Sequence, residues 1–191
     1  MTIYPADYLN GTSDITIAVS DGCKTTEKTF TIHLKTRTQT ISIENGYNII
    51  SLNINLFEKN WMPHVQPLIN SHALYKVLGQ SGSSILKVYG SWQNTIGDID
   101  LSRGYQIFVT EDTEITFTGL NIESSEEIAL ARGWNIMGYP SEYSQTTQNI
   151  LKNLIDDNQL EKVIGHRGSF LKVFGKWYDE LGHLFLAKAI R

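Results

Sequence analysis

Two stretches of this sequence are nearly the same: residues 85–92 read ILKVYGSW and residues 170–177 read FLKVFGKW, 85 residues later along the chain. In each stretch an aliphatic residue stands on either side of a lysine, and this alternation predicts a strand with one buried face. We expect the aliphatic residues to face a core and the lysines to face solvent. The residues assigned inward are Leu86, Val88, Leu171 and Val173, and those assigned outward are Lys87 and Lys172.

Shorter matches surround this pair at almost the same offset, which indicates an internal duplication. Residues 46–50 (GYNII) correspond to residues 133–137 (GWNIM). Residues 75–79 (YKVLG) correspond to residues 161–165 (EKVIG), and the Ile-Gly at 96–97 corresponds to the Leu-Gly at 181–182. The sequence therefore predicts two tandem copies of one small module.

The second copy is predicted to be incomplete. At the offset of the strongest match, Gly104 and Tyr105 of copy one correspond to Ala189 and Ile190. The two strands expected to close copy one, residues 104–109 and 114–119, therefore have no counterparts in copy two. An unpaired sheet edge recruits further strands. We expect the second copy to refold its last residues or to take a strand from copy one, from the N-terminal residues or from a strand-swapped homodimer.

Each copy is expected to contain several strands and one short helix. In copy one, Pro63 suits the first turn of a helix over residues 61–71, which follows a strand at 47–53 and precedes strands at 73–78 and 85–89. In copy two, Ser144 is a candidate N-cap for a helix whose apolar stripe is Ile150, Leu151, Leu154 and Ile155. The predicted fold class is mainly β, an α+β arrangement with one short helix per repeat.

The first forty residues differ from the repeat. Residues 14–20 (DITIAVS) and 28–34 (KTFTIHL) both alternate polar and apolar residues, and Asp21-Gly22 is a turn signal, so a β-hairpin is predicted. A lone hairpin is marginally stable in water, so we expect it either to dock on copy one or to be the remnant of a larger sandwich domain. The chain is thus divided into a hairpin at 1–40, copy one at 41–121 and a truncated copy two at 127–191.

Composition excludes some classes of function. The net charge is −4 and the pI about 5.7, whereas a nucleic-acid-binding protein presents an excess of basic residues. No apolar run is long enough for a membrane span, and the first residues lack the features of a signal peptide. We expect no nucleic-acid partner and no membrane span.

A search for chemistry finds no catalytic motif. The sequence lacks phosphate-binding loops, zinc-protease signatures and nucleophile elbows. Its five histidines are scattered and its one cysteine, Cys23, cannot form an internal disulfide, so no metal site and no cofactor are expected. Asp98 and Asp100 are the candidates for a glycosidase pair, but copy two has His183 and Phe185 there. We expect no catalytic residues and no enzyme.

The aromatic residues of the repeated stretch are the candidate ligand-binding residues. One interpretation is that they recur because they fill the core of each copy; the other is that they form a stacking platform for sugar rings. These residues are Tyr89, Trp92, Phe174 and Trp177.

Two resemblances follow from these patterns. Residues 8–12 (YLNGT), 15–22 (ITIAVSDG) and 29–32 (TFTI) resemble the last two strands of bacterial immunoglobulin-like, cadherin-like repeats. Residues 42–119, and in part 127–182, are similar to uncharacterised modules near the C-termini of large secreted or surface-attached bacterial proteins. Together these resemblances imply an extracellular accessory role beside other domains of a larger surface protein, and they imply no reaction.

Three hypotheses for the function remain. The leading one is a non-catalytic structural or adhesive accessory module of a secreted or cell-surface protein. The first alternative is a carbohydrate-binding module that uses exposed aromatic rings. The second alternative is a glycoside-processing enzyme.

Overall fold

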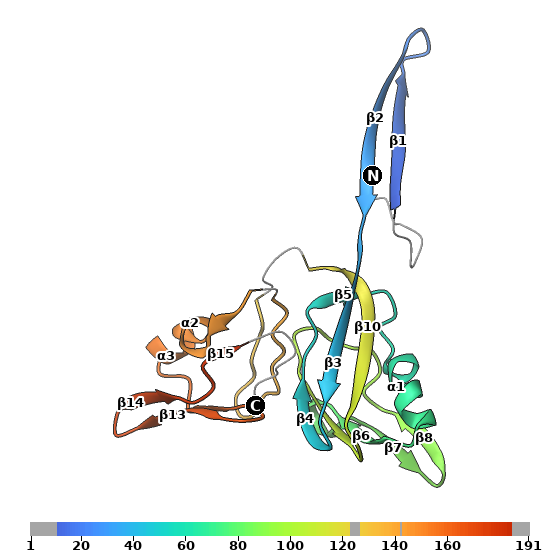
Figure 1. The fold of residues 1–191 in the computed structure, drawn as a ribbon. Coiled ribbons are helices and arrows are strands. Elements are labelled where there is room, and N and C mark those ends of the chain that lie inside the picture. The colour runs from blue at the N-terminus through green and yellow to red at the C-terminus, as the bar shows by residue number, and fades with distance from the viewer. Residues whose placement is uncertain (1–10, 123–126, 142, 185–191) are drawn as a thin grey trace.

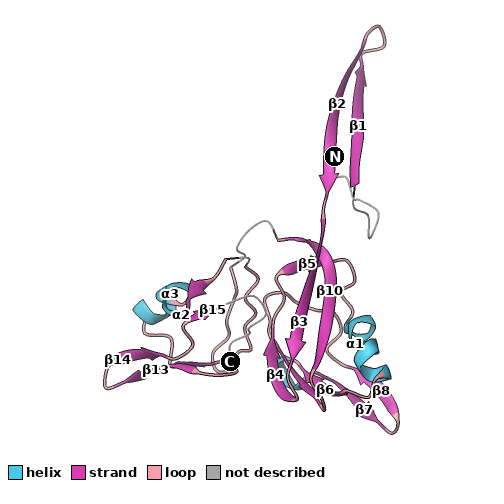
Figure 2. Cartoon of the chain, in the orientation of Figure 1, coloured by secondary structure: helices cyan, strands magenta, loops and turns pink. Residues whose placement is uncertain are grey.

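The computed structural model describes residues 11–122, 127–141 and 143–184, and its fold is mainly β with few helices (Figures 1 and 2). Within these residues an N-terminal hairpin is followed by two bodies, each with a hydrophobic core of its own. We call residues 36–121 the first body and residues 127–184 the second body.

The N-terminal hairpin consists of β1 (Gly11–Ser20) and β2 (Thr25–Leu34), paired antiparallel along their whole length. At the turn, the Asp21 carboxylate accepts hydrogen bonds from the backbone N–H groups of Lys24 (2.7 Å) and Cys23 (2.9 Å). These donors, Lys24 first, lower the pKa of Asp21. The hairpin projects away from both bodies (Figure 1), so its expected packing partner is not found among the described residues.

A three-stranded sheet starts directly after the hairpin. Its order is β3-β10-β5, with β3 (Thr36–Ile43), β10 (Thr113–Asn121) and β5 (Ile54–Leu56). Only Lys35 separates β2 from β3, and β3 extends across the predicted boundary at residue 40. β3 and β10 form eight residue pairs, from Thr36–Leu120 to Ile43–Thr113.

The second sheet of the first body has five antiparallel strands in the order β4-β9-β6-β7-β8. These strands are β4 (Gly46–Ile50), β9 (Tyr105–Val109), β6 (Leu74–Leu78), β7 (Ser84–Val88) and β8 (Ser91–Asn94); a short 3-10 helix, η1 (Gln80–Gly82), connects β6 to β7.

The expected closing hairpin of copy one is wrong. Its two strands exist as β9 and β10, but they belong to different sheets. The Thr110 N–H donates to the carbonyl of Ala73 (2.9 Å), so the chain is held beside β6 before it turns toward β3. These two strands, which are adjacent in sequence, thus lie in different sheets. Strand β9 pairs with β4 and β6, whereas β10 pairs with β3 and β5.

Helix α1 (Trp61–Asn70) joins the two sheets. It begins at the N-cap Asn60, whose side chain accepts from the Met62 N–H (2.9 Å). Trp61 is fully buried, and its ring meets Tyr105 of one sheet edge-on at 4.9 Å and Phe117 of the other at 6.0 Å. The predicted helix is therefore confirmed, and its first residue forms the centre of the core.

The face assigned to β7 is also wrong. Ile85 is the fully buried residue of this strand, whereas Leu86 and Val88 lie half-buried on the other face. The second body repeats this pattern, with Phe170 buried and Leu171 half-buried. The Leu-Lys-Val alternation gave the correct period, but the residue before it determines which face meets the core.

Tyr105 offers a test of the first core. Its hydroxyl accepts from the Asp100 N–H (2.7 Å) and donates to the Asp100 carbonyl (3.3 Å). We expect Tyr105→Phe to lower the free energy of unfolding by about 1 kcal/mol, measured by urea denaturation at neutral pH. Tyr75→Phe, at an exposed side chain, is the control and should change little.

The same residue predicts a pH dependence. Burial raises the pKa of Tyr105 above its usual 10.0, against a lowering by the Asp100 backbone. The folded state thus holds this proton more tightly, so its stability contribution is complete below about pH 10 and is lost as pH rises through the raised pKa. The decrease in stability from about pH 8 to about pH 11 should be smaller in Tyr105→Phe than in the parent. An equal decrease would contradict this prediction.

The second body contains short elements around a smaller core of Met137, Tyr139, Leu151, Val163 and Phe170. Its elements are β11 (Gln145–Thr146), α2 (Thr147–Ile150), α3 (Lys152–Asp156), β12 (Lys162–Ile164), β13 (Ser169–Val173), β14 (Lys176–Asp179) and β15 (His183–Leu184). Strands β12, β13 and β14 form one antiparallel sheet, and β11 pairs with β15.

The helix predicted in copy two is present in altered form. Its N-cap is Thr146, whose hydroxyl accepts from the Asn149 N–H (3.2 Å), and not Ser144. The helix is interrupted at Leu151 (φ −101°, ψ 13°), which separates α2 from α3. The apolar stripe still packs on the core as expected, with Leu151 buried and its other three members half-buried.

Backbone hydrogen bonds connect the two bodies. The Gly104 N–H donates to Ile136 O (2.8 Å) and the Gly138 N–H donates to Ser102 O (2.9 Å), on either side of an antiparallel bridge between Arg103 and Met137. The Arg167 guanidinium also pairs with the Glu44 carboxylate. This ion pair lowers the pKa of Glu44.

Candidate functional site

The candidate binding residues lie on two hairpins, one in each body. The β7–β8 hairpin turns through Tyr89-Gly90, and the β13–β14 hairpin turns through Phe174-Gly175. Both residues of each turn have positive φ: 48° and 88° in the first, and 48° and 80° in the second. This is the type I′ turn, whose twist matches that of the flanking strands.

The aromatic residue at each turn is fully exposed. The relative exposure of Tyr89 is 104% and that of Phe174 is 100%. A bulky residue is uncommon at positive φ, where asparagine or glycine is favoured, and this conformation costs about 1–2 kcal/mol. Because neither ring is buried, packing does not offset that cost. The same unfavourable choice in both hairpins indicates a role other than stability.

The two tryptophans of the repeated stretch are placed differently. Trp92 is half-buried and packs against the first core. Trp177 is stacked on Phe170, with ring centroids 4.6 Å apart and an interplanar angle of 5°. Tyr89 and Phe174 are fully exposed at the turns, whereas Trp92 and Trp177 are half-buried. Each hairpin therefore presents a single ring at its tip.

A polar side chain fixes the segment that follows each hairpin. In the first body, Asn94 Oδ1 accepts from the N–H groups of Ile96 and Gly97, both at 2.9 Å. In the second, Asp179 Oδ1 accepts from the N–H groups of Leu181 (2.9 Å) and Gly182 (2.8 Å). An asparagine in one body and an aspartate in the other thus stabilise the same turn after the hairpin.

Sequence reasoning missed the role of one repeated asparagine. Asn48 Oδ1 accepts from the Glu44 N–H (3.1 Å), and its amide donates to the carbonyls of Glu44 (2.7 Å) and Gly46 (3.3 Å). In the second body, Asn135 makes the same three bonds: it accepts from the Ala131 N–H (3.0 Å) and donates to the carbonyls of Ala131 (2.8 Å) and Gly133 (3.1 Å). Its recurrence in both Gly-aromatic-Asn-Ile segments was the available signal.

Of the two candidate acids, Asp98 is exposed and Asp100 is engaged in local structure. The Asp100 carboxylate accepts from the Ser102 N–H (2.9 Å) and hydroxyl (2.6 Å) and pairs with Arg103 Nε (3.0 Å). Burial raises the pKa of Asp100, but these donors outweigh that effect and the net shift is downward. A carboxyl group that acts as a general acid needs a raised pKa, whereas the pKa of Asp100 is lowered.

Histidines and other ligand types are dispersed. His64 Nε2 lies 2.8 Å from the Glu58 carbonyl, and its ring packs on Phe117. His72 follows the end of α1 with φ 64°, so the two do not share a helical face. Among residues 11–122, 127–141 and 143–184, no group of three or more acidic, histidine or cysteine side chains is placed to hold a metal ion. The helices within those ranges are also too short or too polar for a membrane span.

Comparisons with known proteins do not assign the chain to a family. No family model, no curated protein and no solved structure matches it.

The strained turns predict a gain of stability. We expect Tyr89→Asn and Phe174→Asn each to raise the free energy of unfolding by about 1 kcal/mol, because asparagine tolerates positive φ. The matched controls are Tyr89→Ala and Phe174→Ala, which remove the ring but retain the unfavourable backbone and should give no gain. Urea denaturation measures all four; equal stability of the Asn and Ala variants would contradict the strain argument.

Proposed function

We propose that the chain is a non-catalytic adhesive or structural accessory part of a bacterial secreted or cell-surface protein, in which two tandem modules each present one aromatic ring. The observation that carries this proposal is the pair of hairpin tips at Tyr89 and Phe174. Each ring is fully exposed, and each occupies a backbone conformation that another residue would occupy at lower cost.

Matching hydrogen bonds support the tandem arrangement. The side chains of Asn48 and Asn135 bond the same backbone positions of the loop before them. The two aromatic turns have φ values of the same sign and similar size. In the strand before each turn the buried residue stands at the corresponding position, Ile85 in the first body and Phe170 in the second. Such agreement in detail is expected if one module occurs twice.

The N-terminal hairpin supports a surface protein with further domains. Ile15, Ile17 and Val19 lie on one face of β1, and Phe30 lies opposite Ile15 on the same face of β2. Ile17, Val19 and Phe30 are 40%, 68% and 37% exposed. An apolar sheet face of this kind suits one layer of a sandwich. We therefore assign the hairpin to an immunoglobulin-like domain, as its sequence resemblance implies.

The tips suit adhesion because an aromatic ring contributes a large contact area with few rotatable bonds. Two rings on one chain also allow two weak contacts to reinforce each other. A carbohydrate-binding function is the second candidate, and the exposure of both rings favours it, since planar rings can stack on sugars.

Binding of the purified chain to coated surfaces tests this function. The probes are collagen and fibrinogen for protein adhesion, and cellulose, chitin and peptidoglycan for carbohydrate binding. The double variant Tyr89→Ala/Phe174→Ala should reduce retention by about ten-fold or more, and each single variant by less. The control is Tyr143→Ala, at a side chain 77% exposed and outside both hairpins.

The pattern of binding separates the candidates. Loss confined to collagen or fibrinogen supports adhesion, and loss confined to the polysaccharides supports the carbohydrate function. Retention that the double variant does not alter, or no retention of the parent chain on any of the five surfaces, would contradict both.

A further inference from the structure

The outer face of the five-stranded sheet carries three aromatic rings and one lysine, which we call the ring cluster: Tyr47, Tyr75, Lys76 and Phe108. In the strand register, Phe108 of β9 stands opposite Tyr47 of β4 on one side and opposite Lys76 of β6 on the other. Ile107, the residue before Phe108, is fully buried. Because side chains alternate between the two faces of a strand, the ring cluster faces away from the core.

A β-bulge in β6 turns two consecutive side chains to this outer face. Leu74 pairs with Val109, and Lys76 pairs with Phe108, so the intervening Tyr75 is an extra residue in the ladder. Leu74 is buried, whereas Tyr75 is exposed and Lys76 is half-buried. Bulges redirect side chains, and this one brings the Tyr75 ring beside Lys76.

The three rings of the cluster contact one another, with Phe108 in the middle. The centre of the Phe108 ring lies 4.6 Å from that of Tyr47 and 4.9 Å from that of Tyr75. Both tyrosine side chains are more than half exposed, although each rests on Phe108. Because this contact restricts both tyrosine rings, the cluster presents two preformed aromatic surfaces to solvent.

Lys76 adds a positive charge beside the two exposed rings. Its Nζ lies 5.3 Å from the centre of the Tyr47 ring and 5.7 Å from that of Tyr75, both within cation–π range. A hydrogen bond with the Tyr47 side chain raises the pKa of Lys76, against a lowering by burial, so the ammonium is charged at neutral pH. Among residues 11–122, 127–141 and 143–184, no carboxylate forms an ion pair with Lys76.

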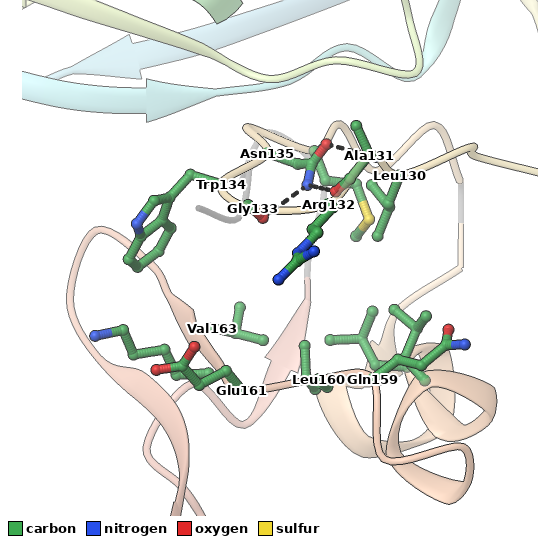
Figure 3. Close-up of a pocket in the computed structure, with 14 residues that line it drawn as sticks. Leu130, Ala131, Arg132, Gly133, Trp134, Asn135, Gln159, Leu160, Glu161 and Val163 are labelled. Carbon is green, nitrogen blue, oxygen red and sulfur yellow. Dashed lines mark hydrogen bonds between the residues drawn. The ribbon is translucent and has the colours of Figure 1, made fainter.

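The second body retains part of this cluster. Lys162 Nζ lies 5.2 Å from the centre of the Trp134 ring, which is the same kind of pair at the corresponding positions of the repeat. Glu161 stands in the position of Tyr75, and Figure 3 shows Glu161 and Trp134 among the residues that line a pocket. A carboxylate at this position repels an anion. The second tyrosine thus distinguishes the first body.

These groups together fit a sugar ring that carries a carboxylate. The apolar face of a sugar ring can stack on an exposed tyrosine ring, and a carboxylate forms a charge-assisted hydrogen bond with an ammonium group. A neutral sugar would leave the ammonium without a counter-charge, and an apolar protein surface would bury it at a cost in desolvation. The net charge of −4 disfavours a nucleic acid.

We infer that the ring cluster binds uronic acid units of an acidic polysaccharide, with sugar rings stacked on Tyr47 and Tyr75 and a carboxylate paired with Lys76. This site lies on the sheet face of the first body and shares no residue with the hairpin tips. It goes beyond the proposed adhesion through Tyr89 and Phe174 and does not depend on it.

Titration of the full chain with three acidic tetrasaccharides, followed by NMR, tests this site. The probes are tetragalacturonate, tetramannuronate and a tetrasaccharide of hyaluronan, and we expect saturable binding of at least one. Methyl esterification of that probe removes its charge and retains its rings, so it should weaken binding by about ten-fold or more. The protein is unchanged in this comparison, so misfolding cannot cause the loss.

A pair of lysine variants locates the bound carboxylate. Lys76→Ala should weaken binding by about ten-fold or more, because it removes the paired charge. The matched control is Lys87→Ala, which removes the same charge from the same sheet. Lys87 follows the buried Ile85 by two residues and therefore lies on the opposite face, so this variant should bind like the parent.

The contribution of the rings is measured separately. Tyr75→Ala should weaken binding by about five-fold, whereas Tyr75→Phe retains the ring and should stay close to the parent. The double variant Tyr89→Ala/Phe174→Ala should bind the acidic tetrasaccharides like the parent. A failed tip assay and a failed tetrasaccharide assay are therefore separate results.

Three results would overturn this assignment. The first is the lack of saturable binding of all three tetrasaccharides, and the second is equal binding of the esterified probe. The third is an equal loss in Lys76→Ala and Lys87→Ala, since this would mean general electrostatic attraction and not a site on the outer face.

Discussion

Trp61→Ala is expected to lower the free energy of unfolding of the first body by about 3–5 kcal/mol. Trp61 is fully buried and contacts Tyr105 in one sheet and Phe117 in the other. Its removal leaves a large cavity where three elements meet, and the sheets cannot close it without losing their own hydrogen bonds. Urea denaturation followed by far-ultraviolet circular dichroism measures the change.

The control for this variant is Trp134→Ala, at a side chain that is 53% exposed. It removes the same number of atoms but only about half the buried area, so a clearly smaller loss than that of Trp61→Ala is expected. Hydrogen exchange should show faster opening of β9 and β10 in Trp61→Ala while β13 is unchanged. Similar losses for the two variants would show that Trp61 is not the centre of the core.

Gly138→Ala is expected to separate the second body from the first. A Cβ at Gly138 would lie 2.4 Å from Leu101 O and 2.8 Å from Arg103 O. Because backbone atoms cannot withdraw as a flexible side chain does, the two hydrogen bonds beside the Arg103–Met137 bridge are lost. Their loss should weaken the docking by about 2 kcal/mol, or about thirty-fold in the docking equilibrium.

Small-angle scattering measures this separation as an increase in the radius of gyration. The circular dichroism spectrum should remain that of the parent, since neither core is altered. Gln80→Ala is the control: it removes the side-chain contact to Asn135 (3.3 Å) without adding an atom at the backbone contact, and its scattering should match the parent. An unchanged radius in Gly138→Ala would mean that other contacts hold the bodies together.

The sequence predicted most of the local elements. The hairpin at β1–β2, helix α1 and strands β4, β6, β7, β9 and β10 were predicted, because periodicity and turn residues act over short distances. Strands β3, β5 and β8 were not predicted. The partners of β9 and β10 were not predicted. A short connection favours a hairpin, but here β9 completes one sheet and β10 the other, and only the whole arrangement determines that outcome.

The candidate site was predicted as a set of residues but not as an arrangement. The repeat identified Tyr89, Trp92, Phe174 and Trp177 together. Their separation into exposed tips and half-buried partners depends on the positive φ of Tyr89 and Phe174, which the following glycines permit. An aromatic-glycine pair between two short strands was the sequence signal for these tips.

The direct passage from β2 to β3 determines how the chain responds to mechanical tension. The chain enters the β3–β10 ladder at Thr36, which pairs with Leu120 where β10 leaves toward the second body. A force pulling the hairpin and the second body apart is therefore applied at one end of the ladder. The pairs open one after another from that end instead of resisting together, so the first body can lengthen in small steps while its five-stranded sheet stays intact.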